Sequence, residues 1–273
     1  MPARNLLDNS DFRNPVNQRG KNTYSDAGNE YTIDRWKTQY NTNISIENGY
    51  INIFGNWELY QRIQNPKDGI YTFAARIRVN SVGQHTPNII VYDGSNTANE
   101  HLLDANTGEW KTYIFQHDLS STTGGTITFS LSPRGGNTIA SISVEWAAMY
   151  KGAYTADTLP AYQPKGYTAE LAECQRYYQI IPEQTSCAFS TTAQSNKYFA
   201  SSINFPQMRV TPTVSLKTDS NGNIGVVQGV AFVSASEFDF AYKLNGTLLP
   251  ATTNANYAGK VMSFYGIELN ADL

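Results

Sequence analysis

The stretch Tyr71-Thr-Phe-Ala-Ala-Arg-Ile-Arg-Val79 decides the fold class of this chain. Every second residue from Tyr71 to Val79 is apolar, and two arginines stand at alternate positions. Successive side chains of a β-strand point to opposite faces, so this spacing places the apolar side chains together on one face. The stretch therefore predicts a strand with one face in a core and the other face turned outward.

The same period of two recurs along the first half of the chain. It is found in residues 43–47, 50–54, 59–63, 110–115, 126–132 and 141–150. Turn-forming residues separate these segments, at Asn48-Gly49, Lys67-Asp68-Gly69, Asp93-Gly94, Gly124-Gly125 and Arg134-Gly135-Gly136. Many short strands with closely spaced turns, and no helical period between them, are typical of an antiparallel sandwich. We expect an all-β protein whose N-terminal domain is a β-sandwich of the jelly-roll type.

A change of composition after Tyr150 marks the expected domain boundary. Residues 151–166 carry two glycines and two prolines with little alternation, which is typical of a linker. The expected divisions are a jelly roll over 1–152, a linker over 153–166 and a smaller C-terminal β-sandwich domain over 167–273.

One short helix is expected to open the C-terminal domain. Thr168 can cap it, apolar residues follow at spacings of three and four, and Pro182 prevents its continuation. Those apolar residues are Leu171, Cys174, Tyr178 and Ile181. Beyond the helix the period of two returns in 213–217, 230–234, 238–244 and 260–269, with Asn221-Gly222 and Asn245-Gly246 as hairpin turns.

The composition indicates a folded protein and argues against several partners. Hydrophobic residues make up 40% of the chain and charged residues 16%, unlike a disordered sequence. The formal net charge is -3, and neither sign forms a run that could neutralise a phosphate backbone, so we expect no nucleic-acid partner. No apolar run is long enough for a spanning helix, and residues 1–8 lack a signal-peptide pattern, so we expect no membrane insertion.

The chain has two cysteines, Cys174 and Cys187, too few for the disulfide framework of a small secreted domain. We favour two buried thiols in a protein made in a reducing cytoplasm, and a disulfide between them stays open.

Motifs for enzymatic chemistry are missing from the sequence. His85, His101 and His117 are isolated, and no pattern supplies zinc ligands, a phosphate-binding loop or a nucleophile elbow. We therefore expect no enzyme, no cofactor and no metal site. A pair of carboxylates for glycoside hydrolysis stays open, because the sequence does not give the distance between scattered acids.

Aromatic residues beside amides, carboxylates and arginines indicate a candidate saccharide site. Aromatic faces stack on sugar rings while polar neighbours bind the hydroxyls. The candidate carbohydrate-binding residues are Trp57, Tyr60, Arg62, Tyr92 and Asp93. Alternation from Leu59 turns Tyr60 and Arg62 outward; Trp57 either joins the core or is released from it by a turn at Gly55-Asn56. Tyr92 and Asp93 either carry a ring over a concave face or form an ordinary hairpin tip.

Three further tryptophans and one adjacent charge pair have structural interpretations. Trp36, Trp110 and Trp146 each lie within an apolar alternation and are expected in the core. Asp34 and Arg35 are expected to form a local ion pair that fixes the first strands.

Three separated stretches resemble the tail-fibre and minor structural proteins of bacteriophages and prophages. The first, from Asn5-Leu-Leu-Asp-Asn-Ser-Asp-Phe12 through Gln18-Arg19-Gly20 to Asp34-Arg35-Trp36, resembles the opening of their carbohydrate-binding jelly rolls. This chain has Ser10 where that family usually has glycine. The others are Glu170-Leu-Ala-Glu-Cys-Gln-Arg-Tyr-Tyr178, similar to the helix that follows the jelly roll, and Phe205-Pro-Gln-Met-Arg-Val-Thr-Pro-Thr-Val214, similar to their C-terminal β domain.

The resemblance implies a receptor-binding protein of a virion tail, made in the host bacterium's cytoplasm and commonly a homotrimer. Its implied partners are a bacterial cell-surface polysaccharide and other phage tail proteins. Some jelly rolls of this kind hold calcium near the first and last strands, where Asp11 and Glu145 would be the counterparts. Because Arg13 places a cation where those modules tend to have an acid, we expect no metal here.

The sequence therefore favours a non-catalytic tail protein that binds a glycan on the host surface. We expect the jelly roll to supply the binding site, with Leu171, Tyr178 and the apolar faces of the second domain as the trimer contact. The alternatives are a purely structural or adaptor tail subunit, an accessory part of a polysaccharide-degrading enzyme, and a receptor site on the C-terminal domain.

Overall fold

The structure is a computed structural model that divides into two compact units, Met1–Cys174 and Gln175–Leu273. It describes residues 3–25, 28–64, 66–93, 98–105, 108–119, 125–181, 184–185, 198–216, 226–233, 237–243, 263–264 and 267–271. The second unit is described mainly through its strands, so the candidate site is sought in the first.

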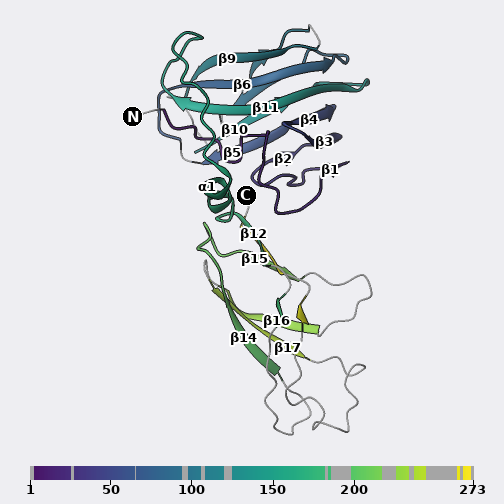
Figure 1. Ribbon diagram of the computed structural model, residues 1–273, viewed down its shortest axis with the longest axis vertical. Helices are drawn as coiled ribbons and strands as arrows, with labels where there is room; N and C mark the ends of the chain where they lie inside the picture. Colours follow the sequence, from purple (N-terminus) through teal and green to yellow (C-terminus); the bar gives the residue numbers. More distant parts are fainter. Residues whose placement is uncertain are drawn as a thin grey trace. The chain divides into compact units, whose positions relative to one another are not determined.

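The first unit is a sandwich of two antiparallel sheets (Figure 1). The six-stranded sheet has the order β1 (Thr23–Tyr24), β3 (Thr42–Glu47), β4 (Tyr50–Gly55), β11 (Ala140–Lys151), β6 (Ile70–Ser81) and β9 (Trp110–Asp118). The five-stranded sheet has the order β2 (Lys37–Thr38), β5 (Leu59–Gln64), β10 (Thr126–Ser132), β7 (Asn88–Tyr92) and β8 (Ala98–Leu102). The prediction of an all-β chain with an N-terminal jelly-roll sandwich is confirmed.

The core of the first unit fills the space between the two sheets. The apolar face of β6 lies in it, from Tyr71 to Val79, as the alternation predicts. Phe129 of β10 stacks on Phe73 with ring centroids 6.0 Å apart and meets the edge of Trp36 at 6.2 Å. These rings come from both sheets and the N-terminal segment, so their packing joins the layers of the sandwich.

The linker covers part of the outer face of the six-stranded sheet. Tyr162 stacks on Trp146 with centroids 4.6 Å apart, and Leu159 packs against the same small cluster. Trp146 is buried, as predicted, but in this second cluster and not between the sheets.

The core assignment of Trp110 is wrong. Trp110 begins the edge strand β9, is only partly buried, and has the guanidinium carbon of Arg78 4.9 Å from its ring centroid. The same guanidinium carbon lies 5.2 Å from the ring centroid of Tyr50, and the two rings meet edge to face with centroids 5.7 Å apart. An edge position leaves a large ring without neighbours on one side, so apolar alternation alone overstated its burial.

The helix α1 (Tyr167–Cys174) is shorter than expected and belongs to the first unit. Tyr178 and Ile181 lie instead on strand β12 (Tyr178–Ile181) of the second unit. The helix is fixed to the first unit because the backbone amide of Asn9 donates a hydrogen bond to the Glu170 carboxylate. The boundary between the two units therefore lies after the helix, at Cys174–Gln175, whereas the sequence predicts it within the linker 153–166.

Buried polar side chains fasten the N-terminal segment of the first unit. The Asn9 amide group donates to the backbone carbonyls of Val16 and Asp34 and accepts from the Val16 amide, at 2.7 to 2.8 Å. Asp34 pairs with Arg19 at 2.9 Å, and Arg35 pairs with Asp8 at 3.2 Å. These ion pairs connect Asp34 and Arg35, which the sequence predicts as a local pair, to different segments of the chain.

The second unit contains only β-strands among its described elements. Its sheets have the orders β12–β19–β15, β13–β18 and β14–β17–β16. The bounds are β13 (Gln184–Thr185), β14 (Tyr198–Asn204), β15 (Thr213–Leu216), β16 (Val226–Val233), β17 (Glu237–Lys243), β18 (Ser263–Phe264) and β19 (Ile267–Asn270). The predicted turns at 221–222 and 245–246 lie outside the described residues, as does Cys187, while Cys174 is a buried free thiol.

Within the described ranges, no helix has the length and apolar character needed to cross a membrane.

Tyr178 is expected at a trimer contact, but it is 2% exposed in the single chain. Its ring is therefore not available to a second copy.

Replacing Phe129 with alanine tests the joint between the sheets. We expect the free energy of unfolding of the first unit to fall by about 3–5 kcal/mol, because the cavity removes ring contacts to both layers. All four tryptophans lie in the first unit, so their fluorescence during denaturant unfolding reports that unit alone. The exposed Leu102→Ala is the control; a Phe129→Ala loss no larger than the control's would contradict this account of the core.

Candidate functional site

A groove of about 450 Å³ lies on the outer face of the five-stranded sheet. We call it the outer-face groove. Its lining is Asn56, Trp57, Glu58, His85, Ile90, Tyr92, Glu100, Ser132, Arg134, Gly136 and Asn137. The volume lies within the usual range for small-molecule sites, and the lining combines two aromatic rings with amides and charged groups.

Strand parity explains how this face acquires its side chains. Ile89 and Val91 of β7 point into the core, so Ile90 and Tyr92 point outward into the groove. On the neighbouring strand β10, Ser132 reaches the groove while Leu131 enters the core. The core and the groove are therefore opposite faces of the same strands.

Trp57 owes its exposure to the turn that follows β4. Gly55 ends that strand with φ +128, and a Cβ there would lie 2.1 Å from the Asn41 carbonyl oxygen, so only glycine fits. Trp57 comes two residues later and is 49% exposed. Of the two interpretations of Trp57, the structure supports release from the core at Gly55-Asn56.

Glu58 and Tyr92 are joined at the floor of the groove. The Tyr92 hydroxyl donates a hydrogen bond of 2.7 Å to Oε1 of Glu58, whose side chain is 5% exposed. Burial, followed by this bond to a carboxylate, raises the pKa of the Tyr92 phenol. The ring of Tyr92 is thus held as a neutral phenol in a fixed position.

Arg134 and Glu100 form the charged wall of the groove. Nη1 of Arg134 lies 2.6 Å from Oε2 of Glu100, and both side chains are about one third exposed (32% and 39%). Arg134 follows β10, whereas Glu100 lies on the edge strand β8, so the ion pair spans strand β7 between them.

Two buried polar side chains of the five-stranded sheet have no hydrogen-bond partner among the residues that the structure describes. These are the Asn88 amide and the Ser130 hydroxyl, both fully buried. Asn88 pairs in register with Ser132, and Ser130 pairs with Ile90, so both follow the outward parity of groove residues. An unsatisfied buried polar group costs about 1–3 kcal/mol, so these two residues lower the stability of the sheet beside the groove.

The structure separates the five predicted carbohydrate-binding residues. Trp57 and Tyr92 line the groove together. Arg62 and Tyr92 pair with the same residue, Thr128 of β10, so they share the sheet face, but Arg62 and Tyr60 are outside the lining.

The outward exposure expected of Tyr60 is wrong. Its side chain is 8% exposed, because β5 is flanked by β2 and β10 and the guanidinium of Arg62 lies 5.6 Å from the ring centroid. Asp93 has the opposite parity to Tyr92, and its Oδ2 lies 3.2 Å from Nε2 of His117. It is therefore engaged away from the groove.

Several groove residues were not among the predicted site residues. Glu58 shares the parity of Tyr60 and Arg62, so the alternation could have identified it. Arg134 lies in the predicted turn Arg134-Gly135-Gly136, so its position at the end of a strand could have indicated it. Glu100 could not be found this way, because only the pairing of β8 with β7 brings it to the groove.

The residues considered for calcium are bound to arginines. Asp11 accepts from Arg13 at 2.6 and 3.2 Å, and Glu145 accepts from Arg76 at 2.9 Å. Each carboxylate therefore has a guanidinium at hydrogen-bond distance, where a calcium ion would have to compete for the same oxygens.

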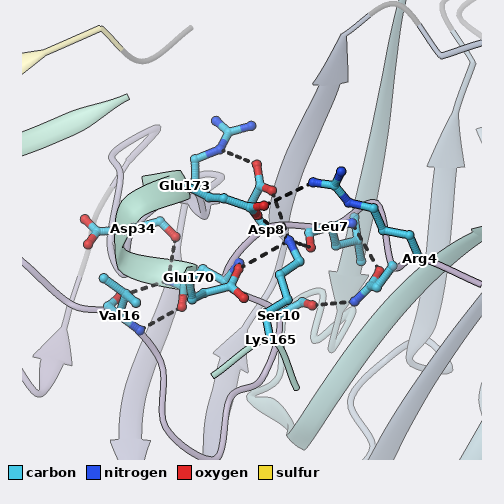
Figure 2. A network of polar contacts seen from close by, with 12 residues as sticks. Arg4, Leu7, Asp8, Ser10, Val16, Asp34, Lys165, Glu170 and Glu173 are labelled. Carbon is cyan, nitrogen blue, oxygen red and sulfur yellow. Dashed lines mark hydrogen bonds and ion pairs between the residues drawn. The ribbon is translucent and has the colours of Figure 1, made fainter. Parts of the chain in front are cut away.

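A second acidic cluster holds a lysine among three carboxylates (Figure 2). Oxygens of Asp8, Glu170 and Glu173 lie within 4.8 Å of one another. The Lys165 ammonium lies 2.5 Å from Glu173, 3.4 Å from Asp8 and 3.8 Å from Glu170. Because the lysine already supplies the compensating charge, the cluster acts as a clasp between the helix, the end of the linker and the N-terminal segment.

The comparisons with known proteins find similar structures but no related sequence. No protein-family model matches the chain, and no curated protein matches it. A CBM4 structure is 16% identical, with a TM-score of 0.37 over 54% of this chain and 99% of the other. TmCBM61 in complex with β-1,4-galactotriose is 16% identical, with a TM-score of 0.33 over 55% and 100%. The enzymatically active domain of bacteriophage CBA120 tailspike protein 4 is 10% identical, with a TM-score of 0.34 over 54% and 21%. These values are too low to transfer a ligand or an activity.

Replacing Lys165 with methionine tests the clasp. We expect the free energy of unfolding at pH 7 to fall by about 2 kcal/mol, because three partly buried carboxylates lose the cation that they share, although Asp8 keeps Arg35 and Glu173 keeps Arg4. Burial, above all, raises the pKa of Glu170 from its ordinary 4.5. Ionisation of Glu170 therefore destabilises the folded state relative to the unfolded chain. The contribution of Glu170 to the free energy of unfolding is greatest below pH 4.5, where the carboxyl is protonated in both states. The deficit of the variant should therefore shrink as the pH falls towards 4.5.

The matched control for this variant is Lys111→Met. Lys111 pairs with Asp104 at 3.1 Å in an exposed position, where solvent screening leaves an ion pair little net contribution to stability. The free energy of unfolding of both variants is measured with denaturant. An equal decrease for Lys165→Met and Lys111→Met would show that the clasp contributes no more than a surface ion pair.

Proposed function

We propose that this protein is a bacteriophage or prophage tail component that attaches to a bacterial cell-surface glycan through the outer-face groove, without breaking the glycan. The observation that carries the binding proposal is the half-exposed Trp57 ring beside amide, carboxylate and guanidinium groups in one groove. The ring offers an apolar face to the C–H groups of a sugar, and the polar groups match its hydroxyls.

The floor of the groove supports the same proposal. Glu58 is a hydrogen-bond acceptor fixed by Tyr92, and both residues belong to the lining. A pyranose presents several hydroxyls that both donate and accept. Hydroxyls of a bound sugar, directly or through water, would give the buried Glu58 carboxylate further hydrogen-bond donors.

The tail role rests on the resemblance of three sequence stretches to phage tail proteins. Two of these stretches meet in the first unit, where the Asn9 amide donates to Glu170 and Asp8 lies beside Lys165. The N-terminal motif and the helix motif, which are far apart in the sequence, are thus in direct contact in the first unit.

Substitution of Trp57 tests glycan binding by the groove. A few aromatic contacts of ~0.5–1.5 kcal/mol each imply millimolar to micromolar affinity for one groove. We expect Trp57→Ala to weaken binding to host cell-surface polysaccharide at least about tenfold in calorimetry, since it removes the stacking face. Tyr40→Ala, a similarly exposed ring outside the lining, should leave the affinity unchanged. Failure of the unsubstituted protein to bind any host polysaccharide would favour a purely structural or adaptor subunit.

An oligomer can bind a cell surface through several weak groove sites at once. We propose a homotrimer, with the Gln175–Leu273 unit as its contact. Light scattering should then give three times the chain mass of 30.3 kDa. Apparent affinity on a dense glycan surface should exceed the solution value by ~100- to 10,000-fold through avidity. Protein that stays monomeric at every concentration would contradict the trimer.

An alternative function is favoured by one observation, the presence of both Glu58 and Glu100 in the groove. Two carboxylates beside a bound sugar are the requirement for glycoside hydrolysis. We favour binding alone, because Glu58 is tied to Tyr92 and Glu100 to Arg134. Release of reducing ends from the bound glycan, abolished by Glu58→Gln, would establish the hydrolytic function instead.

A further inference from the structure

We infer that the outer-face groove selects neutral saccharides and rejects acidic ones, an inference that rests on the proposed glycan binding and names its ligand class. The charges of the groove carry it. Two carboxylates, those of Glu58 and Glu100, line the groove with one guanidinium, that of Arg134. With histidine counted as neutral, the formal charge at this site is negative.

The single guanidinium of the lining is committed to another group. Arg134 lies 2.6 Å from Glu100, closer than a typical N–H to oxygen contact. A uronate or phosphate on the ligand could bind Arg134 only by displacing Glu100. That exchange gains no net ion pair, and it leaves the Glu100 carboxylate beside a second anion.

The buried carboxylate of Glu58 opposes an acidic ligand independently. It is 5% exposed, so water screens it poorly, and its one described hydrogen bond comes from the neutral phenol of Tyr92. Its negative charge is therefore not compensated by a cation through that bond. A ligand anion in the same groove would meet a repulsion that grows as water is excluded.

The same groups suit a neutral sugar. Hydroxyls can donate to the oxygens of Glu58 and Glu100 as charge-assisted hydrogen bonds, which are stronger than neutral ones. The face of Trp57 contacts C–H groups and requires no charge. A neutral polysaccharide thus uses every class of group in the lining without breaking the Arg134–Glu100 pair.

Paired ligands that differ only in charge test this selectivity. The probes are oligosaccharides of a neutral glucan, galactan and mannan, each compared with its C6-oxidised uronate form of the same linkage and length. We expect the full-length protein to bind at least one neutral form at least tenfold more tightly than its oxidised counterpart in calorimetry at low salt. Added salt should reduce the difference in affinity between the neutral and oxidised forms, because screening weakens the repulsion between the uronate and the carboxylates of the groove.

The variant Glu100→Gln sharpens the test. It frees Arg134 and removes one negative charge, so affinity for the oxidised form should rise at least tenfold, while the neutral form loses a charge-assisted hydrogen bond and gains no new partner. Glu109→Gln, an exposed acid outside the lining, removes the same charge and should not change the preference.

The possible results separate this inference from the proposed function. Equal or tighter binding of the oxidised form by the unsubstituted protein would overturn the neutral selectivity and leave glycan binding in place. Binding of none of the six probes, together with none of the host polysaccharides, would overturn the proposed function itself.

Discussion

A β-strand has two faces, and only one of them can be buried against a partner sheet. In the first unit this constraint assigns Ile89, Val91 and Leu131 to the core and leaves Ile90, Tyr92 and Ser132 on the outside. The outside of the six-stranded sheet is partly closed by the linker, through Tyr162 on Trp146. The outside of the five-stranded sheet instead carries the groove, so the geometry of the core determines which side chains a ligand can meet.

The polar lock at the N-terminus keeps this arrangement in place. Asn9 and Asp34 are buried and hydrogen-bonded, while the Trp36 indole donates to the Asn9 carbonyl at 2.8 Å. Buried polar groups stabilise a fold only when their bonds are made, so they specify one path for the chain more strictly than apolar contacts do. Glu170 extends the same lock to the helix. The residues of the Asn5–Phe12 and Asp34–Trp36 motifs are therefore scaffold, and the ligand-facing residues lie elsewhere in the sequence.

The sequence allowed the sandwich to be predicted because its evidence is local. Alternation of two and turn residues are properties of neighbouring positions, and β6 shows both. The helix was predicted too long because Tyr178 and Ile181 continue the spacing of Leu171 and Cys174, although they lie on β12 and pair with β19. Helical spacing over so few residues does not exclude a turn and a strand, which pairing with a distant segment decided.

The site was predicted only in part, for a related reason. Trp57 and Tyr92 carry local signals, a glycine turn and the end of an apolar run. The partners that give them a chemical setting come from pairing across strands: Glu100 through β8 and Arg134 beyond β10. Alternation also gave Tyr60 its face correctly, but it could not give its burial beneath Arg62. Parity tells which way a side chain points, while its neighbours on the same and adjacent strands decide whether it reaches solvent.

The groove combines features that a protein optimised only for stability would avoid. Glu58 in its lining is a carboxylate at 5% exposure, and in the sheet beside it Asn88 and Ser130 are buried with no hydrogen-bond partner among the described residues. Apolar residues at these positions would remove the desolvation cost, and β7 and β10 already supply such residues on their other face. The Glu58 carboxylate in the lining costs stability that binding can offset, whereas the fully hydrogen-bonded Asn9 shows how this fold treats a buried polar group with a structural role. The contrast between Glu58 and Asn9 is the strongest physical argument for a ligand at this face of the sheet.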